Sequence, residues 1–328
     1  MNHQQDHSMI DVSVVIVCMN KPDLLRVSLD SIREQTHQVS YEVLVVAYLF
    51  TAENLAMMRE AYPWVRFIES KEIRGFAENN NLALRQAQGR YCFVVNDDTK
   101  LTTPVLDQLV HTFEQRVSER VAIVSPVLLD AEGKVQICGV KPKTYRDAVL
   151  ECFHLWKYHS PSPYTNQPGL FRSYNIIGAA FMIRTELFRS LGWFDERFFF
   201  CPEDIVLSTL VNEKGYECWV DNDARLIHYE GLSSQSLSRM QTATKPAATR
   251  GTMIHFGTTV TRRWVLSLAT VFYYLPKVIV FKLKFLVKRS ERDDIKAISA
   301  WHSICAAFSR RTPKEIFIHY YSKLSKHA

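Results

Sequence analysis

Short apolar stretches alternate with amphipathic stretches through most of the chain. The apolar stretches are rich in Val and Ile and end in turn-forming residues, which is typical of strands buried in a parallel sheet. The amphipathic stretches carry apolar residues three or four positions apart, which indicates helices packed by one face. The pattern predicts strands at 12–18, 41–47 and 65–68, with helices at 23–35 and 54–62. This order predicts the α/β class, with a mainly parallel central sheet and flanking helices.

The same alternation continues beyond residue 75, with one long interruption. Further strands are expected at 92–95, 121–125, 176–183 and 224–227, and further helices at 82–87, 104–115, 185–191 and 205–214. Residues 130–174 have no clear period and contain four prolines with aromatic residues between them. A stretch of this length inside a compact domain is either a functional loop or an insertion.

The composition is that of a folded protein, with 47% hydrophobic and 23% charged residues in 328. Its charge is uneven: residues 262–328 hold 14 Lys and Arg against 4 Asp and Glu, whereas residues 1–261 hold 26 against 30. A slightly acidic body is not expected to bind nucleic acid. The seven cysteines form no C-x-x-C pair and the N-terminus has no apolar signal core, which favours reduced thiols and a cytoplasmic location.

Two adjacent carboxylates, Asp97 and Asp98, follow the apolar run that is expected to form a central strand. Ligand sites of α/β folds lie at the carboxyl ends of such strands. A divalent cation would relieve the repulsion between the two carboxylates, and their hard oxygens suit Mg²⁺ or Mn²⁺. The alternative is an ordinary polar turn in which Asp97 caps a helix.

Two further segments contain candidate functional residues. Gly75 and the Asn run that ends at Asn80 and Asn81 precede a predicted helix, where they would either bind an anion or simply cap the helix. Glu203 and Asp204 follow a cluster of five aromatic residues, which favours a general base with a raised pKa. The alternative is that the two acids only begin the following helix.

His228 ends the last predicted strand. A histidine in that position is either a metal ligand or a hydrogen-bonded structural residue, and the residue type alone does not decide between them.

Five segments together resemble the family 2 glycosyltransferases of GT-A fold, and most of all the rhamnosyltransferase-type enzymes of bacterial surface polysaccharide synthesis. They occur in the family's order and span about residues 12–235. The segments are VSVVIVCMN, RGFAENNN, VVNDDT, GAAFMIRTELFRSLGWFDERFFFCPED and IHYEGLS. The fourth segment, with NDDT before it, is the most specific of the five.

The resemblance implies roles for the acidic residues and the histidine. Asp97 and Asp98 match the motif that holds the metal, Mg²⁺ or Mn²⁺, with the ribose and diphosphate of the donor. Asp204 matches the catalytic base, with Glu203 beside it, and His228 matches a position near the metal and the diphosphate.

The resemblance also implies a nucleotide site formed by Asn20, Gly75, Asn80 and Asn81. The chain departs from the family pattern at two positions near the expected sites. Ala47 stands where the family usually has an Asp that contacts the nucleoside, so the preference of this chain for a nucleobase is open. The acidic pair also lacks the second Asp that often follows it in the family.

These observations predict an inverting hexosyltransferase, with rhamnosyl transfer as one option. It would move a sugar from a nucleoside diphosphate sugar to a hydroxyl of a glycan or lipid-linked acceptor. Residues 10–125 would bind the donor, residues 126–250 would bind the acceptor and carry the base, and residues 255–328 would form a basic helical tail. The alternatives are a nucleotidyltransferase, for which the early glycine-rich basic loop is missing, and a degenerate glycan- or nucleotide-binding scaffold.

The tail has a stretch, 264–287, in which 18 of 24 residues are apolar. It contains Pro276 and three lysines, and its longest uncharged run, 264–276, is shorter than the ~20 residues that a spanning helix needs. We therefore expect one or two amphipathic helices, broken near Pro276, on the inner surface of the cytoplasmic membrane through residues 262–289. The alternatives are packing on the catalytic body and an oligomer contact.

Overall fold

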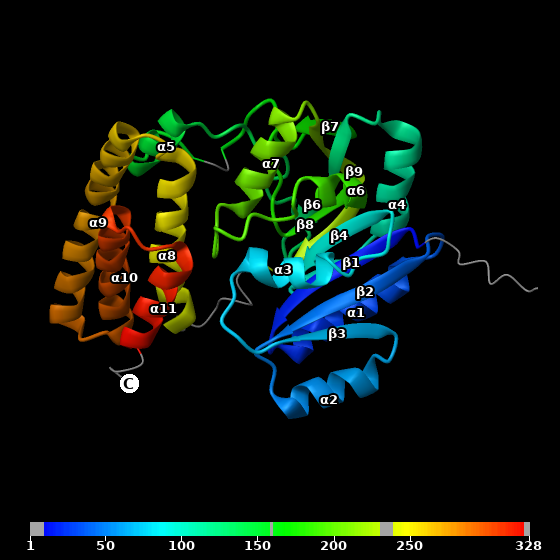
Figure 1. The fold of residues 1–328 in the computed structure, drawn as a ribbon, viewed down its shortest axis with the longest axis horizontal. Helices are drawn as coiled ribbons and strands as arrows, with labels where there is room; N and C mark the ends of the chain where they lie inside the picture. Colours follow the sequence, from blue (N-terminus) through cyan, green and yellow to red (C-terminus); the bar gives the residue numbers. More distant parts are fainter. Residues whose placement is uncertain (1–9, 158–159, 230–238, 325–328) are drawn as a thin grey trace, which may run out of the picture.

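The computed structural model describes residues 10–157, 160–229 and 239–324 (Figure 1). Residues 230–233, the last four of the IHYEGLS segment, lie outside the described part of the chain. The strands are β1 (Val12–Met19), β2 (Tyr41–Tyr48), β3 (Val65–Ser70), β4 (Tyr91–Asn96), β5 (Thr99–Leu101), β6 (Val121–Leu129), β7 (Leu170–Ser173), β8 (Ala180–Arg184) and β9 (Glu217–His228).

The described helices alternate with the strands in the first two-thirds of the chain and form a group at its end. They are α1 (Pro22–Gln35), α2 (Ala52–Ala61), α3 (Phe76–Leu84), α4 (Val105–His111) with a π-helical turn (Thr112–Arg116), α5 (Tyr145–Cys152), α6 (Thr185–Ser190), α7 (Glu203–Glu213), α8 (Arg239–Phe256), α9 (Val260–Lys288), α10 (Glu291–Phe308) and α11 (Pro313–Leu324). Figure 1 shows α8 to α11 together at one end of the molecule, beside the sheet.

The strands form one mixed sheet in the order β3-β2-β1-β4-β8-β6-β9-β5, with β7 paired to β9. Strands β3, β2, β1 and β4 are parallel, whereas β8 is antiparallel to both β4 and β6. The predicted mainly parallel α/β sheet is therefore confirmed. The antiparallel β8 places the carboxyl end of β4 beside the amino end of β8.

The alternation of side chains in β1 explains why the sheet is covered on both faces. Val14 and Ile16 belong to one core cluster, with residues of α1, and Val15 belongs to a second cluster, with residues of α3. Successive side chains of a strand point to opposite faces, so a continuous apolar run requires a cover on each side. The run VSVVIVC is therefore consistent only with a central strand.

Helix α3 begins earlier than the sequence indicates, at Phe76 rather than residue 82. Gly75 is its N-cap, and the Glu78 side chain accepts a hydrogen bond from the Gly75 N–H at 3.1 Å. The prediction that the Asn run caps this helix is wrong, because the run lies inside the helix with its side chains buried. This Glu78 contact is one half of a capping box, and it is present where an Asn cap was expected.

Residues 130–174 are more ordered than their composition predicts, since they contain α5 and β7. The predicted domain limit at residue 255 falls at the end of α8, and α8 packs mainly on α10 and α11.

The predicted break near Pro276 is also wrong. Helix α9 runs without interruption through this proline. A proline inside a helix costs roughly 3 kcal/mol because it removes one backbone hydrogen bond and crowds the preceding turn. Packing of α9 along α10 offsets this cost, and Pro276 is exposed, so that water can reach the carbonyl left without a donor.

Candidate active site

The predicted acidic pair lies in the turn between β4 and β5. Both side chains are buried, but they meet different neighbours. Burial, together with the nearby Asp98 charge, raises the pKa of Asp97 to about 6, while a hydrogen bond with the Cys18 thiol of β1 opposes the rise. Asp98 lies beside β9, where its Oδ1 is 3.4 Å from the Nε2 of His228. The structure thus brings Asp98 and His228 together.

Gln136 fixes the orientation of the His228 ring. Its Nε2 donates a hydrogen bond to the His228 carbonyl at 3.1 Å, and its Oε1 lies 3.4 Å from His228 Nδ1. Since the amide nitrogen is the donor in the first contact, the amide oxygen must accept from Nδ1–H in the second. In the neutral ring this leaves the lone pair on Nε2, facing the Asp98 carboxylate, an arrangement that requires a cation between the two groups. No sequence pattern indicates a role for Gln136, because this residue lies in a stretch without a period.

The side chains of Asp97, Asp98 and His228 do not form one three-ligand cluster in the structure, and their role as metal ligands stays a prediction. The described residues include no group of three or more His, Cys, Asp or Glu side chains that could hold a metal ion. Successive residues at a strand end point to different sides, so Asp97 faces Cys18 while Asp98 faces His228. A carboxylate and a neutral imidazole nitrogen still fit Mg²⁺ or Mn²⁺, because such ions commonly take only one or two protein ligands and complete their shell with phosphate oxygens and water.

Asn20 directly follows β1 and has a positive φ of 50°. Its Oδ1 accepts hydrogen bonds from the Thr51 N–H at 3.2 Å and the Asn54 side chain at 2.9 Å. The residue therefore joins the carboxyl edge of the sheet to the start of α2. Its contact with a nucleotide stays a prediction.

Asn80 and Asn81 have protein partners inside the fold. The Asn80 amide donates to the Phe76 carbonyl at 2.9 Å, one turn earlier in the helix. The Asn81 amide donates to the Phe194 carbonyl at 2.9 Å and to Glu196 at 2.8 Å, and its oxygen accepts from the Phe194 N–H at 3.1 Å. Asn81 thus ties α3 to the segment before α7. A role beside the nucleotide stays a prediction for both residues.

Gly75 allows a close approach between the start of α3 and the aromatic segment. A Cβ on Gly75 would lie 2.1 Å from the carbonyl oxygen of Phe199, and the neighbouring Phe76 N–H donates to that same oxygen at 2.8 Å. The contact is between two backbones, so neither side can move away cheaply.

Replacing Gly75 with Ala is therefore expected to destabilise the protein by roughly 1–3 kcal/mol or more, as overpacking does elsewhere. Gly133→Ala is the matched control: its φ is 79° but nothing lies within 4 Å, so about 1–2 kcal/mol of backbone strain is expected. Urea unfolding of both variants measures the difference. A Gly75→Ala variant as stable as the wild type would contradict the close approach at Phe199.

Glu203 and Asp204 form the first turn of α7, and the Asp204 side chain contacts the segment that leads into β8. A Cβ on Gly178 would lie 3.6 Å from the Cβ of Asp204. One residue on, the Ala179 carbonyl accepts a hydrogen bond from the Asn96 N–H at 2.9 Å. The acidic turn after β4 and the acidic pair of α7 therefore lie at the same edge of the sheet, joined by these small residues.

The two carboxylates of α7 differ in their environment. Burial raises the pKa of Glu203 to about 8, the Asp204 charge adds to the rise, and Glu203 Oε2 has no hydrogen-bond partner among the described residues. Glu203 is then mainly protonated near neutral pH, and it adds no second negative charge beside Asp204. This division of charge suits Asp204 to accept a proton.

The raised pKa of Glu203 makes stability depend on pH. Its folded-state pKa lies above the value of 4.5 in the unfolded chain, so the folded state binds more protons between those values. The stabilisation is fully present below about pH 4.5 and is lost as the pH rises through about 8. Glu203→Gln is therefore expected to raise the melting temperature relative to the wild type at pH 8, by about 2 °C or more, and less at pH 5. A pH-independent difference between the two proteins would contradict this assignment.

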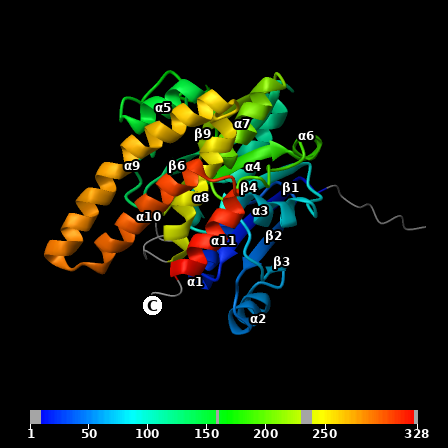
Figure 2. The ribbon, with the colours of Figure 1, turned by 60° about the vertical axis from the view of Figure 1, so that its left-hand side comes forward.

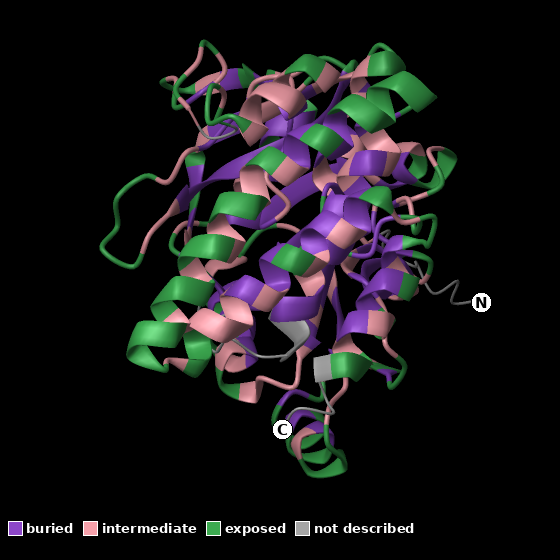
Figure 3. Cartoon of the chain, turned by 90° about the vertical axis from the view of Figure 1, so that its left-hand side faces the viewer, coloured by how far each residue is buried: buried purple, intermediate pink, exposed green. Residues whose placement is uncertain are grey.

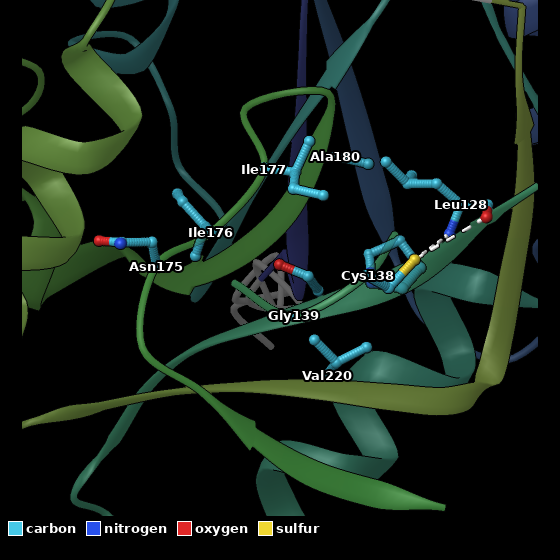
Figure 4. A pocket seen from close by; sticks show the side chains of 10 residues that line it. Leu128, Cys138, Gly139, Asn175, Ile176, Ile177, Ala180 and Val220 are labelled. Carbon is cyan, nitrogen blue, oxygen red and sulfur yellow. Dashed lines mark hydrogen bonds between the residues drawn. The ribbon is translucent and has the colours of Figure 1, made fainter. Parts of the chain in front are cut away.

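A small cavity lies close to this edge, between β6, β8 and β9 (Figure 4). Its volume is about 10 Å³, and Ile177, Ala180 and Val220 are among its lining residues. Ser125 and Asn175 are also lining residues, and the Ser125 hydroxyl and the Asn175 amide oxygen have no hydrogen-bond partner within the described part of the chain. The cavity has the size of one water molecule, so it is too small to bind a nucleotide sugar.

The model of glycosyl transferase family 2 matches residues 13–192, which include β1, the Asp97–Asp98 turn and β8. The chain belongs to this family. Over 228 residues it is 30% identical to the O-antigen biosynthesis protein RfbC of Myxococcus xanthus, and over 234 residues it is 25% identical to the uncharacterized protein y4gI of Sinorhizobium fredii. These matches cover 69% and 68% of the chain, but only 18% and 25% of the relatives.

The fold of this family 2 glycosyltransferase is similar to that of a solved structure of GalNAc-T7 with UDP, GalNAc and Mn²⁺. The two share 17% identity over 73% of this chain and 48% of the other, with a TM-score of 0.55. This likeness confirms the GT-A fold predicted from the sequence. Family membership confirms the coarser part of the functional prediction, whereas the sugar and the mechanism belong to the proposal below.

Proposed function

We propose that the protein is an inverting glycosyltransferase that moves a sugar from a nucleoside diphosphate sugar to a hydroxyl of a glycan or lipid-linked acceptor. The observation that carries the proposal is that the Asp98–His228 contact and the Glu203–Asp204 pair lie at the same edge of the sheet. One group of residues suits a diphosphate with its metal, and the other suits a proton acceptor. Family membership supports the transfer of a sugar, and the name of one relative, an O-antigen biosynthesis protein, supports a role in surface polysaccharide synthesis.

In this proposal, Asp204 takes the proton of the acceptor hydroxyl while its oxygen attacks the anomeric carbon of the donor. The bond from that carbon to the diphosphate breaks on the opposite side, so one displacement inverts the configuration. Protonated Glu203 keeps a second charge away from Asp204. Asp98 and His228 would hold Mg²⁺ or Mn²⁺, whose charge stabilises the leaving diphosphate. Gln136 holds the His228 ring in the required tautomer.

Cytoplasmic location is part of the proposal. The seven cysteines are all unpaired, which is usual for proteins of a reducing compartment.

The test is a panel of nucleotide sugars, dTDP-rhamnose among them, in thermal-shift assays with Mg²⁺, with Mn²⁺ and with EDTA. A ligand that binds only the folded state raises the melting temperature, so the donor is expected to do so only with metal. Release of nucleoside diphosphate on adding acceptor would then separate an enzyme from a binding scaffold. Release of pyrophosphate from a nucleoside triphosphate and a sugar phosphate would instead favour a nucleotidyltransferase and overturn the proposal.

A further inference from the structure

One side of α9 carries a continuous row of exposed apolar side chains, which we call the outer stripe. Its members lie three or four residues apart, so they share one helix face for about 33 Å. Phe272, Leu283 and Leu286 keep 66%, 56% and 58% of their surface exposed. The outer stripe consists of Trp264, Leu268, Phe272, Leu275, Ile279, Leu283 and Leu286.

The inner side of α9 already has its partner. Leu266, Ser267, Ala269 and Thr270 are buried, and the Ser267 hydroxyl donates to the Ala307 carbonyl of α10 at 2.9 Å. Figure 2 shows α9 and α10 as an antiparallel pair that extends away from the strands. In Figure 3, viewed from this end of the molecule, exposed residues recur along the helices. The outer stripe is therefore a second apolar face, in addition to the one that builds the fold.

Most of the outer stripe has no cover within the described residues. Two members have an aromatic neighbour: the ring centre of Phe153 is 5.9 Å from that of Phe272, and the ring centre of Phe308 is 5.7 Å from that of Trp264. Both neighbours are themselves exposed. Apolar patches of this extent on a folded protein mark a site of association with a protein or a membrane.

The charge around the outer stripe indicates which partner it fits. Residues 260–289 contain no Asp or Glu. The basic residues in this range are Arg262, Arg263, Lys277, Lys282, Lys284, Lys288 and Arg289. Lys282 is paired with Asp294 of α10, and the others leave the segment strongly positive. Each Lys or Arg near an anionic lipid surface contributes about 1 kcal/mol of attraction.

Two other occupants fit less well. A second copy of the chain would bring two strongly positive segments together without any acidic residue between them, which is unfavourable. A transmembrane span is compatible with the length of α9. Among the described helices, α9 alone is long and apolar enough to cross a membrane, and 22% of its most apolar stretch is buried. A span would carry Lys277, Lys282 and Lys284 into the bilayer at about 2.5–3.5 kcal/mol each on insertion scales, and it would strip α9 from the charged start of α10.

We propose that the outer stripe of α9 lies in the interface of an anionic lipid bilayer, with the helix parallel to the membrane and its apolar side chains among the acyl chains. The basic residues then lie at the level of the lipid headgroups, as in other interfacial amphipathic helices. Docking uses a face that is exposed in the folded protein, so it requires no unfolding of the α9–α10 pair. It also holds the catalytic body close to acceptors that are anchored in the same membrane.

The test is co-sedimentation of the full chain with vesicles of phosphatidylglycerol and phosphatidylcholine, and with vesicles of phosphatidylcholine alone. The variant carries Phe272→Ser, Ile279→Ser and Leu283→Ser, all at exposed positions. The control carries Val27→Ser, Met57→Ser and Val135→Ser, which are exposed apolar residues on other elements. Thermal melting followed by circular dichroism checks that both remain folded.

We expect the wild type and the control to bind the anionic vesicles and to be released by high salt or carbonate, and the α9 variant to bind at least tenfold more weakly. Equal binding of the variant and the control would overturn the proposal. Release of the wild type from cell membranes by detergent alone would overturn it in favour of a span. A dimer in light scattering that the variant loses, without vesicle binding by the wild type, would assign the outer stripe to a second copy.

Discussion

Replacing Asp204 with Asn is expected to lower the rate of sugar transfer by about 10²–10⁴-fold, the usual contribution of a general base. Donor binding should remain, because Asp204 is not part of the Asp98–His228 contact that would hold the metal. Stability should not fall, since Asn has nearly the same shape and removes a charge from a buried acidic pair. Single-turnover transfer and calorimetric titration of the donor measure the two properties separately.

Two variants of the same helix serve as controls for Asp204→Asn. Glu203→Gln imitates the protonated form of that residue and should keep most of the activity near neutral pH, because Glu203 with its raised pKa is already mainly protonated there. Glu213→Gln changes an exposed acid at the other end of α7 and should behave as the wild type. Wild-type transfer by Asp204→Asn, with a strong loss in Glu203→Gln, would move the role of the base to Glu203.

Replacing Asp98 with Asn is expected to weaken metal-dependent donor binding by about 100-fold or more. Loss of a residue that only orients a metal ligand typically costs 10–100-fold, and loss of the ligand itself should cost at least as much as the upper end of that range. Donor affinity in Mg²⁺, in Mn²⁺ and in EDTA is the measurement. In EDTA the variant and the wild type should bind the donor equally weakly. An unchanged affinity in the presence of metal would remove Asp98 from this role.

Variants around Asp98 test the arrangement that the structure gives. Gln136→Leu removes the two contacts that orient His228 and should weaken metal-dependent binding by about 10–100-fold while the ligands stay in place. Asp97→Asn should keep the metal dependence, since the Asp97 carboxyl is hydrogen-bonded with Cys18 and forms no three-ligand group with Asp98 and His228. Glu119→Gln, an exposed change, is the control. Loss of metal dependence in Asp97→Asn would restore the three-ligand site.

The α/β class and the order of the first strands followed from the sequence alone. Val14, Val15 and Ile16 are apolar in succession, and only a strand covered on both faces buries such a run. The sequence also predicted a ligand site at the acidic turn after β4. Polar residues that follow a central strand lie at the edge of the sheet where α/β folds bind their ligands. These features depend on residues that are close in the chain, so that local periodicity and turn chemistry determine them.

Only the tertiary structure decided which of the candidate residues meet. Gln136 contacts His228 across 92 positions of sequence, and Asn81 contacts Phe194 across 113. No local pattern reports such contacts, because they depend on the order of the strands and on loops without a period. The continuity of α9 through Pro276 is decided in the same way: the local cost of a proline is a few kcal/mol, and packing on α10, a separate helix, offsets it.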